Sequence, residues 1–345
     1  MIKQRVQWVD SIKCIAIVCI MGNHLSFMND KLYAVISPIY LMPFFFCSGY
    51  TYKQKLGFKD FLAAKARQLL IPWLVLSVFN ILLAQVFSFN SHKSLGEELL
   101  WNFLQIRGKD DGMWFVAALF VAYIPFYFFV RWYRGRQITP KRTAAFLLLA
   151  FVLSVGSMLY MQLTDPAAFP WGSPALPWHL EYMFQAMLFM ALGYVFREKW
   201  EAWFDAHNSV AVLVAAAVAY LLVTSGAFQW LQPDGLERLA IPLAYARQLL
   251  GVSVLVSLCK KIKPGRYMQF VGQNTLLYFG LHGKLCSLIA AGIAGMLPGV
   301  YARLMGDALY SSVAVIVSAL FMSVVLIGPI WVINRYVPFV AGKRK

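Results

Sequence analysis

The stretch DSIKCIAIVCIMGNH, from Asp10 to His24, is an apolar run with a cation, Lys13, near its start and a histidine, His24, at its end. Ten residues separate the two, so a helix would place them about 16 Å apart along its axis. With its flanks, the run is typical of a membrane-spanning helix. Ionisable groups are costly inside a bilayer and usually have a function there. The stretch therefore predicts a membrane protein in which His24 takes part in chemistry.

The amino-acid composition is that of an integral membrane protein. Of its 345 residues, 60% are hydrophobic and 13% charged, and the mean hydropathy is +0.63, whereas a soluble domain is about 45–50% apolar and about 25% charged. The net charge of +16 falls in short clusters between apolar runs, which is the pattern of a polytopic protein and not of nucleic-acid binding. The five cysteines lie in apolar segments without CxxC spacing, so we predict neither a disulfide framework nor a metal site.

Ten stretches are apolar enough to cross a bilayer. They are residues 8–28, 33–52, 67–89, 112–131, 143–162, 178–197, 208–226, 239–259, 270–296 and 309–335. With ten spans, every large basic cluster falls on the side of the two termini, and the positive-inside rule makes that side cytoplasmic. We therefore expect an all-α polytopic protein of about ten transmembrane helices with both termini cytoplasmic. The longest loop, 90–111, is too short to fold alone, so we predict one membrane-embedded domain over 1–345 and no soluble domain.

The chemistry of these spans centres on histidine. His24 could accept a proton from a hydroxyl and return it to a leaving group. Such a base needs an anionic partner to orient its ring, and Glu181, at the start of the sixth span, is the best candidate because it should lie at a similar depth. Glu181 could instead be an interfacial acid that faces water, and we expect the neighbouring His179 at the solvent edge.

Several other polar residues have both a functional and a structural interpretation. Lys13 could anchor its helix at the interface, or could bind an anion that enters from the cytoplasm. Basic residues 53–67 could hold lipid phosphates or the phosphates of a nucleotide. In the ninth span, His282 could hydrogen-bond to a neighbouring helix or contact the substrate, and Asn274 lies where that span enters the membrane.

The pattern resembles the acyltransferase family 3 membrane proteins, within them the sugar O-acetyltransferases such as fucose 4-O-acetylases. Five blocks carry the resemblance in the family's order over most of the chain: WVDSIKCIAIVCIMGNH, MPFFFCSGYTYK, KARQLLIPW, DGMWFVAALF and FVGQNTLLYFGLH. Each block is a weak match by itself, but five in order are specific. Many relatives have Arg-x-x-Arg in the third block, where this chain has Lys65-Ala66-Arg67-Gln68, so the resemblance leaves open which residues contact phosphate.

The resemblance implies transfer of an acyl group, most often acetyl, from cytoplasmic acyl-CoA to a hydroxyl of a sugar. In the family the histidine of the first helix is essential, which corresponds to His24, and cations corresponding to Lys13, Lys65 and Arg67 would hold the donor. Acetyl-CoA would be a substrate, with no permanently bound cofactor. We expect a multi-pass protein of the bacterial cytoplasmic membrane that contacts lipids, acts on a cell-surface or lipid-linked glycan, binds no nucleic acid and could form a homo-oligomer.

Two alternative functions without covalent chemistry are also compatible with the sequence. A transporter or flippase of envelope glycan intermediates would also use many spans and intramembrane charges, although the repeated halves common in transporters are not evident in the sequence. A structural or lipid-binding partner in envelope assembly would tolerate apolar residues at His24 and Lys13. Consumption of acyl-CoA separates an enzyme from both.

Overall fold

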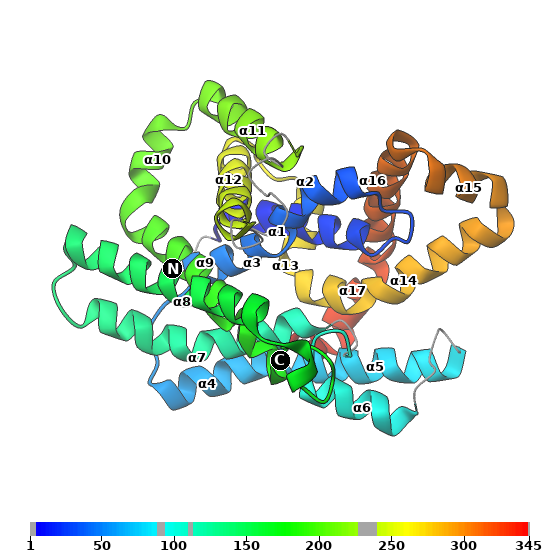
Figure 1. Cartoon of the computed structure of the whole chain (residues 1–345), viewed down its shortest axis with the longest axis horizontal. Coiled ribbons are helices and arrows are strands. Elements are labelled where there is room, and N and C mark those ends of the chain that lie inside the picture. The colour runs from blue at the N-terminus through cyan, green and yellow to red at the C-terminus, as the bar shows by residue number, and fades with distance from the viewer. Residues whose placement is uncertain (1–4, 88–93, 110–112, 227–239, 344–345) are drawn as a thin grey trace. The chain divides into compact units, whose positions relative to one another are not determined.

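The computed structural model describes residues 5–87, 94–109, 113–226 and 240–343. Within these ranges every regular element is a helix (Figure 1), which confirms the all-α prediction. The whole loop 227–238, between the predicted spans 208–226 and 239–259, and part of the loop 90–111 lie outside the described residues. The chain divides into two compact units. Unit 1 is Met1–Phe44 with Ala202–Val332, and unit 2 is Phe45–Glu201 with Ile333–Lys345; the prediction of a single domain over 1–345 stays a prediction.

Unit 1 is built around its first helix, α1 (Gln7–Asn23), which packs against five other helices. These are α2 (Asp30–Tyr40), α12 (Ala240–Lys261), α13 (Arg266–Gln273), α14 (Thr275–Met296) and α16 (Ala308–Val325). Most of α10 (Glu201–His207), with α11 (Val210–Thr224), α15 (Pro298–Gly306) and the first part of α17 (Ile327–Tyr336), completes the unit. Ten of the 17 residues of α1 are buried, whereas Lys13, Ile15, Val18 and Cys19 are half-buried.

The polar start of α1 is neutralised where it is buried. Asp10 is almost fully buried, and its two carboxylate oxygens accept hydrogen bonds from the Arg5 guanidinium, at 2.6 Å from Nε and 2.9 Å from Nη2. Bidentate pairs of this kind are among the stronger polar contacts in proteins. The aspartate at the start of the first sequence block is therefore part of the helix's anchoring.

A glycine permits the close contact between α1 and α13. A Cβ atom on Gly272 would lie 2.0 Å from the carbonyl oxygen of Asp10, a distance that no side chain can occupy. The glycine of the block FVGQN is thus required by backbone packing against the first helix, where small residues let helices approach most closely.

Unit 2 consists of the end of α3 (Met42–Tyr50) and the helices from α4 to α9. They are α4 (Phe58–Lys65), the π-helical turn η1 (Ala66–Leu70), α5 (Ile71–Phe87), α6 (Leu95–Leu104), α7 (Trp114–Arg134), α8 (Pro140–Leu163) and α9 (Leu180–Val195). Short turns η2 (Pro166–Ala168) and η3 (Pro177–His179) precede α9, the π-helical turn η4 (Phe196–Trp200) follows it, and η7 (Pro338–Ala341) lies near the C-terminus.

Two glycines set the contact between α3 and α9. A Cβ on Gly49 would lie 1.8 Å from the Met190 carbonyl oxygen, and one on Gly193 would lie 2.0 Å from that of Phe46. The pair Ser48-Gly49 therefore marks a helix crossing.

Seven helices of the described chain are long and apolar enough to cross a membrane, or up to eight if a bent pair forms one span. The seven are Asp30–Tyr50, Phe58–Val86, Trp114–Arg134, Pro140–Leu163, Ala240–Lys261, Thr275–Met296 and Ala308–Tyr336, and the bent pair is Pro177–His207 with Val210–Thr224. With 17 residues, α1 extends about 26 Å, somewhat less than the roughly 30 Å hydrocarbon core. The chain is a multi-pass membrane protein; the count of ten and the orientation of the termini stay predictions.

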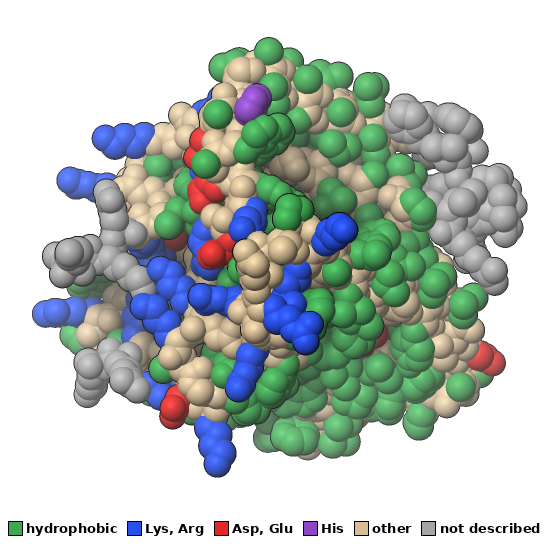
Figure 2. Space-filling model, turned by 90° about the vertical axis from the view of Figure 1, so that its left-hand side faces the viewer, with side chains coloured by type: hydrophobic (Ala, Val, Ile, Leu, Met, Phe, Trp, Pro, Cys, Tyr) green, Lys and Arg blue, Asp and Glu red, His purple; other side chains and the backbone are tan. Residues whose placement is uncertain are grey.

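The charges segregate on the surface. On the face drawn in Figure 2, Lys and Arg side chains gather in one region, and hydrophobic side chains dominate the rest.

The contact at Gly272 can be tested by adding one methyl group. Gly272→Ala should destabilise the protein by about 1–3 kcal/mol, because the new atom forces α13 away from α1. The change in thermal stability is measured by heating the protein in detergent and determining the folded fraction by size-exclusion chromatography.

The matched control is Gly292→Ala in α14, where a Cβ would meet open space. It should leave stability unchanged or raise it slightly, because alanine is the better helix former. Equal stability of the two variants would contradict the packing role of Gly272.

Candidate active site

His24 lies directly after the last residue of α1, in unit 1. Its backbone N–H donates to the carbonyl oxygen of Met21, at 3.2 Å, and so ends the helix. Its side chain is exposed at the protein surface, so a substrate can reach the ring without displacing another element.

The segment after His24 is held to α16 by side-chain hydrogen bonds. The Asn29 amide nitrogen donates to Ser312 Oγ at 2.8 Å and to the Ala308 carbonyl at 3.1 Å. The Asn29 side chain also caps α2 by accepting from the Leu32 N–H at 3.0 Å, and the Ser311 hydroxyl donates to the Phe27 carbonyl. His24 is therefore on a turn fixed at both ends, as preorganised catalytic groups require.

The ring next to His24 belongs to His282, on α14. The two ring centroids are 4.9 Å apart, and the ring planes meet at 63°, edge to face. The residues are 258 positions apart in the chain, so only the packing of α14 beside α1 brings them together. The sequence marked both histidines as candidates but gave no reason to pair them.

The hydrogen bonds of His282 determine which of its nitrogens carries the proton. Nδ1 lies 2.8 Å from the Phe279 carbonyl oxygen and 3.2 Å from that of Tyr278. Carbonyl oxygens only accept, so Nδ1 must be the N–H donor. In the neutral ring, Nε2 is then an acceptor, and it is buried with no hydrogen-bond partner among the described residues.

His282 itself is only 4% exposed. Its hydrogen bonds go to the backbone of its own helix, whereas a bond to a neighbouring helix was the structural alternative considered from the sequence. A buried acceptor without a partner costs about 1–3 kcal/mol, which favours an N–H group, from His24 or from a substrate, at Nε2 in the working protein.

The surroundings of His282 are fixed by two further contacts in unit 1. The hydroxyl of Tyr278, one turn earlier, donates to the Ser323 carbonyl at 3.0 Å and so holds α14 against α16. Asn274, predicted to contact substrate, is buried between α13 and α14, where its side-chain amide donates to the Phe270 carbonyl at 2.8 Å. This contact of Asn274 is structural, and its substrate role stays a prediction.

Glu181 lies in unit 2, in the first turn of α9, and its pairing with His24 stays a prediction. Glu181 is 4% and His179 1% exposed, so the interpretations of a water-facing acid and a solvent-edge histidine are wrong. One Glu181 oxygen accepts from the Leu176 N–H at 3.0 Å, and the other is 3.4 Å from His179 Nδ1. The turn before α9 thus buries an acid and a histidine together.

The backbone beside Glu181 is strained. Trp178 and His179 both have positive φ, at 59° and 53°, in the left-handed region that side chains with a Cβ seldom occupy. Such residues cost of the order of 1–3 kcal/mol each and concentrate at functional sites. The Trp114 ring, in the block DGMWFVAALF, lies 5.0 Å from the His179 ring and helps to hold this conformation. Sequence reasoning did not mark Trp178 or Trp114, because neither positive φ nor ring contact leaves a pattern in the chain.

The three predicted donor-binding cations occupy different surroundings. Lys13 lies in the first half of α1, half-buried, in unit 1. In unit 2, Lys65 ends α4 with its ammonium 3.9 Å from the centre of the Tyr123 ring, a cation–π contact. Arg67 follows in the π-helical turn η1, a geometry frequent at functional sites. Their role as phosphate ligands stays a prediction.

Comparison with known proteins supports one family. The model of the acyltransferase domain, acyltransferase family 3, matches residues 6–335 and thus runs through both units. No curated protein and no solved structure matched the chain. Because the match covers nearly the whole sequence, from the start of α1 to the end of α17, the chain belongs to the acyltransferase family 3 of membrane proteins.

Proposed function

We propose that the protein is a membrane O-acyltransferase that moves an acyl group, most often acetyl, from acyl-CoA to a hydroxyl of a cell-surface or lipid-linked glycan. The observation that carries the proposal is the contact of His24 with His282 in a chain of this family. One ring is exposed, and the other is buried with a free acceptor nitrogen. This is the arrangement of a base with a neighbour that orients it.

In the proposed reaction His24 removes the proton of the sugar hydroxyl while its oxygen attacks the thioester carbonyl carbon. The tetrahedral intermediate collapses with cleavage of the carbon–sulfur bond. The leaving CoA thiolate then takes the proton from His24, so the base is regenerated and no further reactant is needed. In an alternative relay, the donor first acylates His24 and the sugar hydroxyl then takes the acyl group from it; the overall reactants and products are the same.

His282 is proposed as a positioning residue. Because its Nδ1 is committed to the carbonyls of its own helix, Nε2 can accept one N–H of the His24 ring. The second nitrogen of His24 would then be the unprotonated one and would face the substrate. A fixed tautomer of this kind is what a general base needs.

The donor would bind on the basic side through Lys13, Lys65 and Arg67, as the family resemblance implies. Glu181 would act in the same reaction, with its carboxylate oriented by the Leu176 N–H and His179. A buried acid next to a buried histidine supports a catalytic role, since such groups are rarely retained in membrane proteins without one.

Removal of the proposed base should abolish transfer. His24→Ala should lower the rate by about 10²–10⁴-fold, the usual contribution of a general base. Mass spectrometry of ester-linked acyl groups on surface glycans should detect the group in cells with the intact protein and not in cells with the variant or without the gene.

Membrane levels of His24→Ala must equal those of the intact protein in this comparison. If the variant keeps full transfer, the mechanism is refuted. If glycans are identical in all three strains, the acceptor is not a surface glycan, and purified protein is assayed for acyl-CoA consumption; its absence there favours a transporter.

The positioning role of His282 can be separated from a structural one. His282→Phe keeps a ring but removes the acceptor, so kcat should fall about 10- to 100-fold, the range for a lost hydrogen bond to a charged group. His282→Gln retains an acceptor oxygen and should recover part of the loss. Steady-state kinetics of purified protein measures both.

KM for acyl-CoA should stay the same in both His282 variants, because neither touches the donor. Equal kcat values for the phenylalanine and glutamine variants, with normal elution on size exclusion, would contradict the acceptor role.

The predicted orientation has its own test. Fluorescent-protein fusions at each terminus should fluoresce, and alkaline phosphatase fusions at the same positions should be inactive, because both termini are expected in the cytoplasm. An active phosphatase at either end would place the basic clusters on the outer side and contradict a cytoplasmic donor site.

A further inference from the structure

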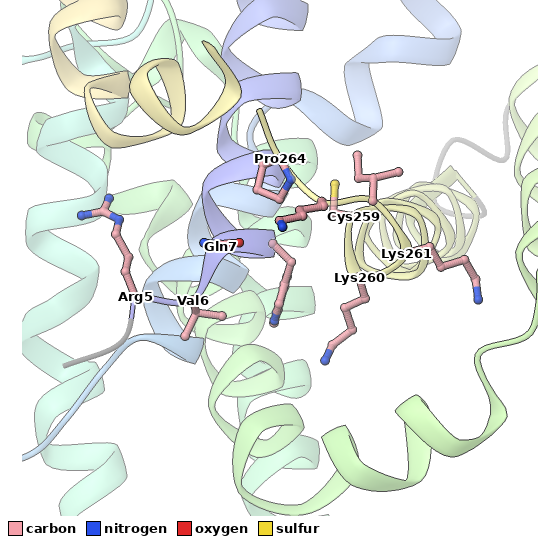
Figure 3. A pocket seen from close by; sticks show the side chains of 10 residues that line it. Arg5, Val6, Gln7, Cys259, Lys260, Lys261 and Pro264 are labelled. Carbon is pink, nitrogen blue, oxygen red and sulfur yellow. The ribbon is translucent and has the colours of Figure 1, made fainter. Parts of the chain in front are cut away.

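A pocket of about 580 Å³ lies in unit 1 at the end of α1 opposite to His24. The start of α1 and the end of α12 with the turn after it form its walls (Figure 3). In Figure 3, Lys260 and Lys261 extend from the end of α12 in different directions, and Arg5 lies on the side of α1. This volume is within the range of small-molecule sites, about 300–1,000 Å³.

The pocket has an excess of positive charge. Four of its ten lining residues are cations: Arg5, Lys260, Lys261 and Lys263. Arg5 is paired with Asp10, Lys260 lies 2.8 Å from the exposed carboxylate of Asp205, and Lys261 donates to the Asn208 carbonyl. Lys263 is exposed. The Lys260 side chain is 9% exposed and the Asp205 carboxylate 51% exposed, so water screens this pair from the carboxylate side only. A phosphate in the pocket would lie beside the Lys260 ammonium and compete with Asp205 for it.

An aromatic surface lies beside the charges. Trp8 also lines the pocket, and the Lys260 ammonium is 5.0 Å from the centre of its ring. An indole next to a cation can stack on a nucleobase while the cation binds the attached phosphate, a combination that recurs in nucleotide-binding sites. A phosphate-bearing ligand with an aromatic base fits this pocket better than a simple anion does.

The distance from the pocket to His24 matches one such ligand. From Gln7, which lines the pocket, α1 rises about 25 Å to His24. In coenzyme A, roughly 21 bonds join the sulfur to the 3′-phosphorus, which at the extension of a polypeptide chain is about 24 Å. Lys13 lies between the two ends, at the height where the diphosphate would be.

We propose that this pocket binds the adenosine 3′-phosphate end of the acyl-CoA donor. The adenine stacks on Trp8, Lys260 and Lys263 bind the 3′-phosphate, the diphosphate passes Lys13, and the pantetheine arm follows α1 towards His24. The inference rests on the proposed function and adds a donor site at the start of the first helix. A phospholipid headgroup shares the phosphate chemistry but has neither an adenine nor a 3′-phosphate.

The test is a comparison of two ligands and two proteins. CoA and dephospho-CoA, which lacks only the 3′-phosphate, are titrated by calorimetry into purified full-length protein in nanodiscs of zwitterionic lipid. The intact protein should bind CoA about 10- to 100-fold more tightly than dephospho-CoA, the range for lost contacts with a charged group. The double variant Lys260→Gln/Lys263→Gln should bind both ligands equally, at the affinity of dephospho-CoA.

The matched control is Lys199→Gln, which removes an exposed lysine of unit 2 and should keep the full preference for CoA. In assays of transfer, the double variant should raise KM for acetyl-CoA by the same factor as it weakens binding and leave kcat unchanged.

The outcomes separate this inference from the proposed function. If the intact protein binds CoA but the double variant keeps the preference over dephospho-CoA, the pocket is not the donor site, while the proposed function stands. Two results would instead make the pocket a lipid site and overturn the inference. In the first, anionic phosphatidylglycerol in the nanodiscs abolishes CoA binding to the intact protein but does not change CoA binding to the double variant. In the second, the double variant loses co-purified anionic lipid but binds CoA as the intact protein does. If the intact protein binds no CoA, the proposed function fails with it.

Discussion

The packing of five helices against the first helix is the constraint on which unit 1 depends. Ten of the 17 residues of α1 are buried, and the side chains of Ile12, Ile17 and Met21 are inaccessible to solvent. This packing leaves no room for a side chain where Gly272 of α13 meets the backbone of Asp10. It also forces the buried carboxylate of Asp10 to find a partner, which Arg5 supplies at the helix start. A helix held in this way can place groups at its two ends at a fixed separation.

The same packing fixes the position of the turn that carries His24. A histidine on an exposed turn would normally sample many orientations, but here the turn is tied to α16 by Asn29 and Ser311. His282 adds a ring whose proton position is fixed by the carbonyls of Phe279 and Tyr278. The two histidine rings therefore lie side by side, one exposed and one buried. Burial alone would disfavour an ionisable residue at the position of His282, and the positioning role proposed above would account for its presence there.

In unit 2, the main structural requirement is to provide hydrogen-bond partners for the buried Glu181. Its carboxylate is buried, and the chain before α9 turns through two residues in the left-handed region to bring a backbone N–H and His179 to it. Tight crossing of α3 and α9 at Gly49 and Gly193 holds the other end of α9. The five sequence blocks of the family thus have different physical tasks. Gly49 and Gly272 provide close helix contacts and His24 and His282 provide polar groups, and the last block, FVGQNTLLYFGLH, supplies a residue of each kind.

The sequence by itself determined the class of the protein. Apolar runs and charge clusters are local properties, so they predicted helices in a membrane, and the order of five blocks predicted the acyltransferase family, which the family match confirms. Residues such as His24, His282 and Glu181 could be selected because an ionisable group within an apolar run stands out in a linear pattern. The burial of Glu181 and His179 was not predictable, because their partners, Leu176 N–H and Trp114, depend on a backbone turn with positive φ. Only the tertiary structure decided that His282 is the neighbour of His24 and that Arg5, Trp8 and Lys260 line one pocket. Those contacts join residues more than two hundred positions apart, and their distances follow from helix packing, which no local pattern encodes.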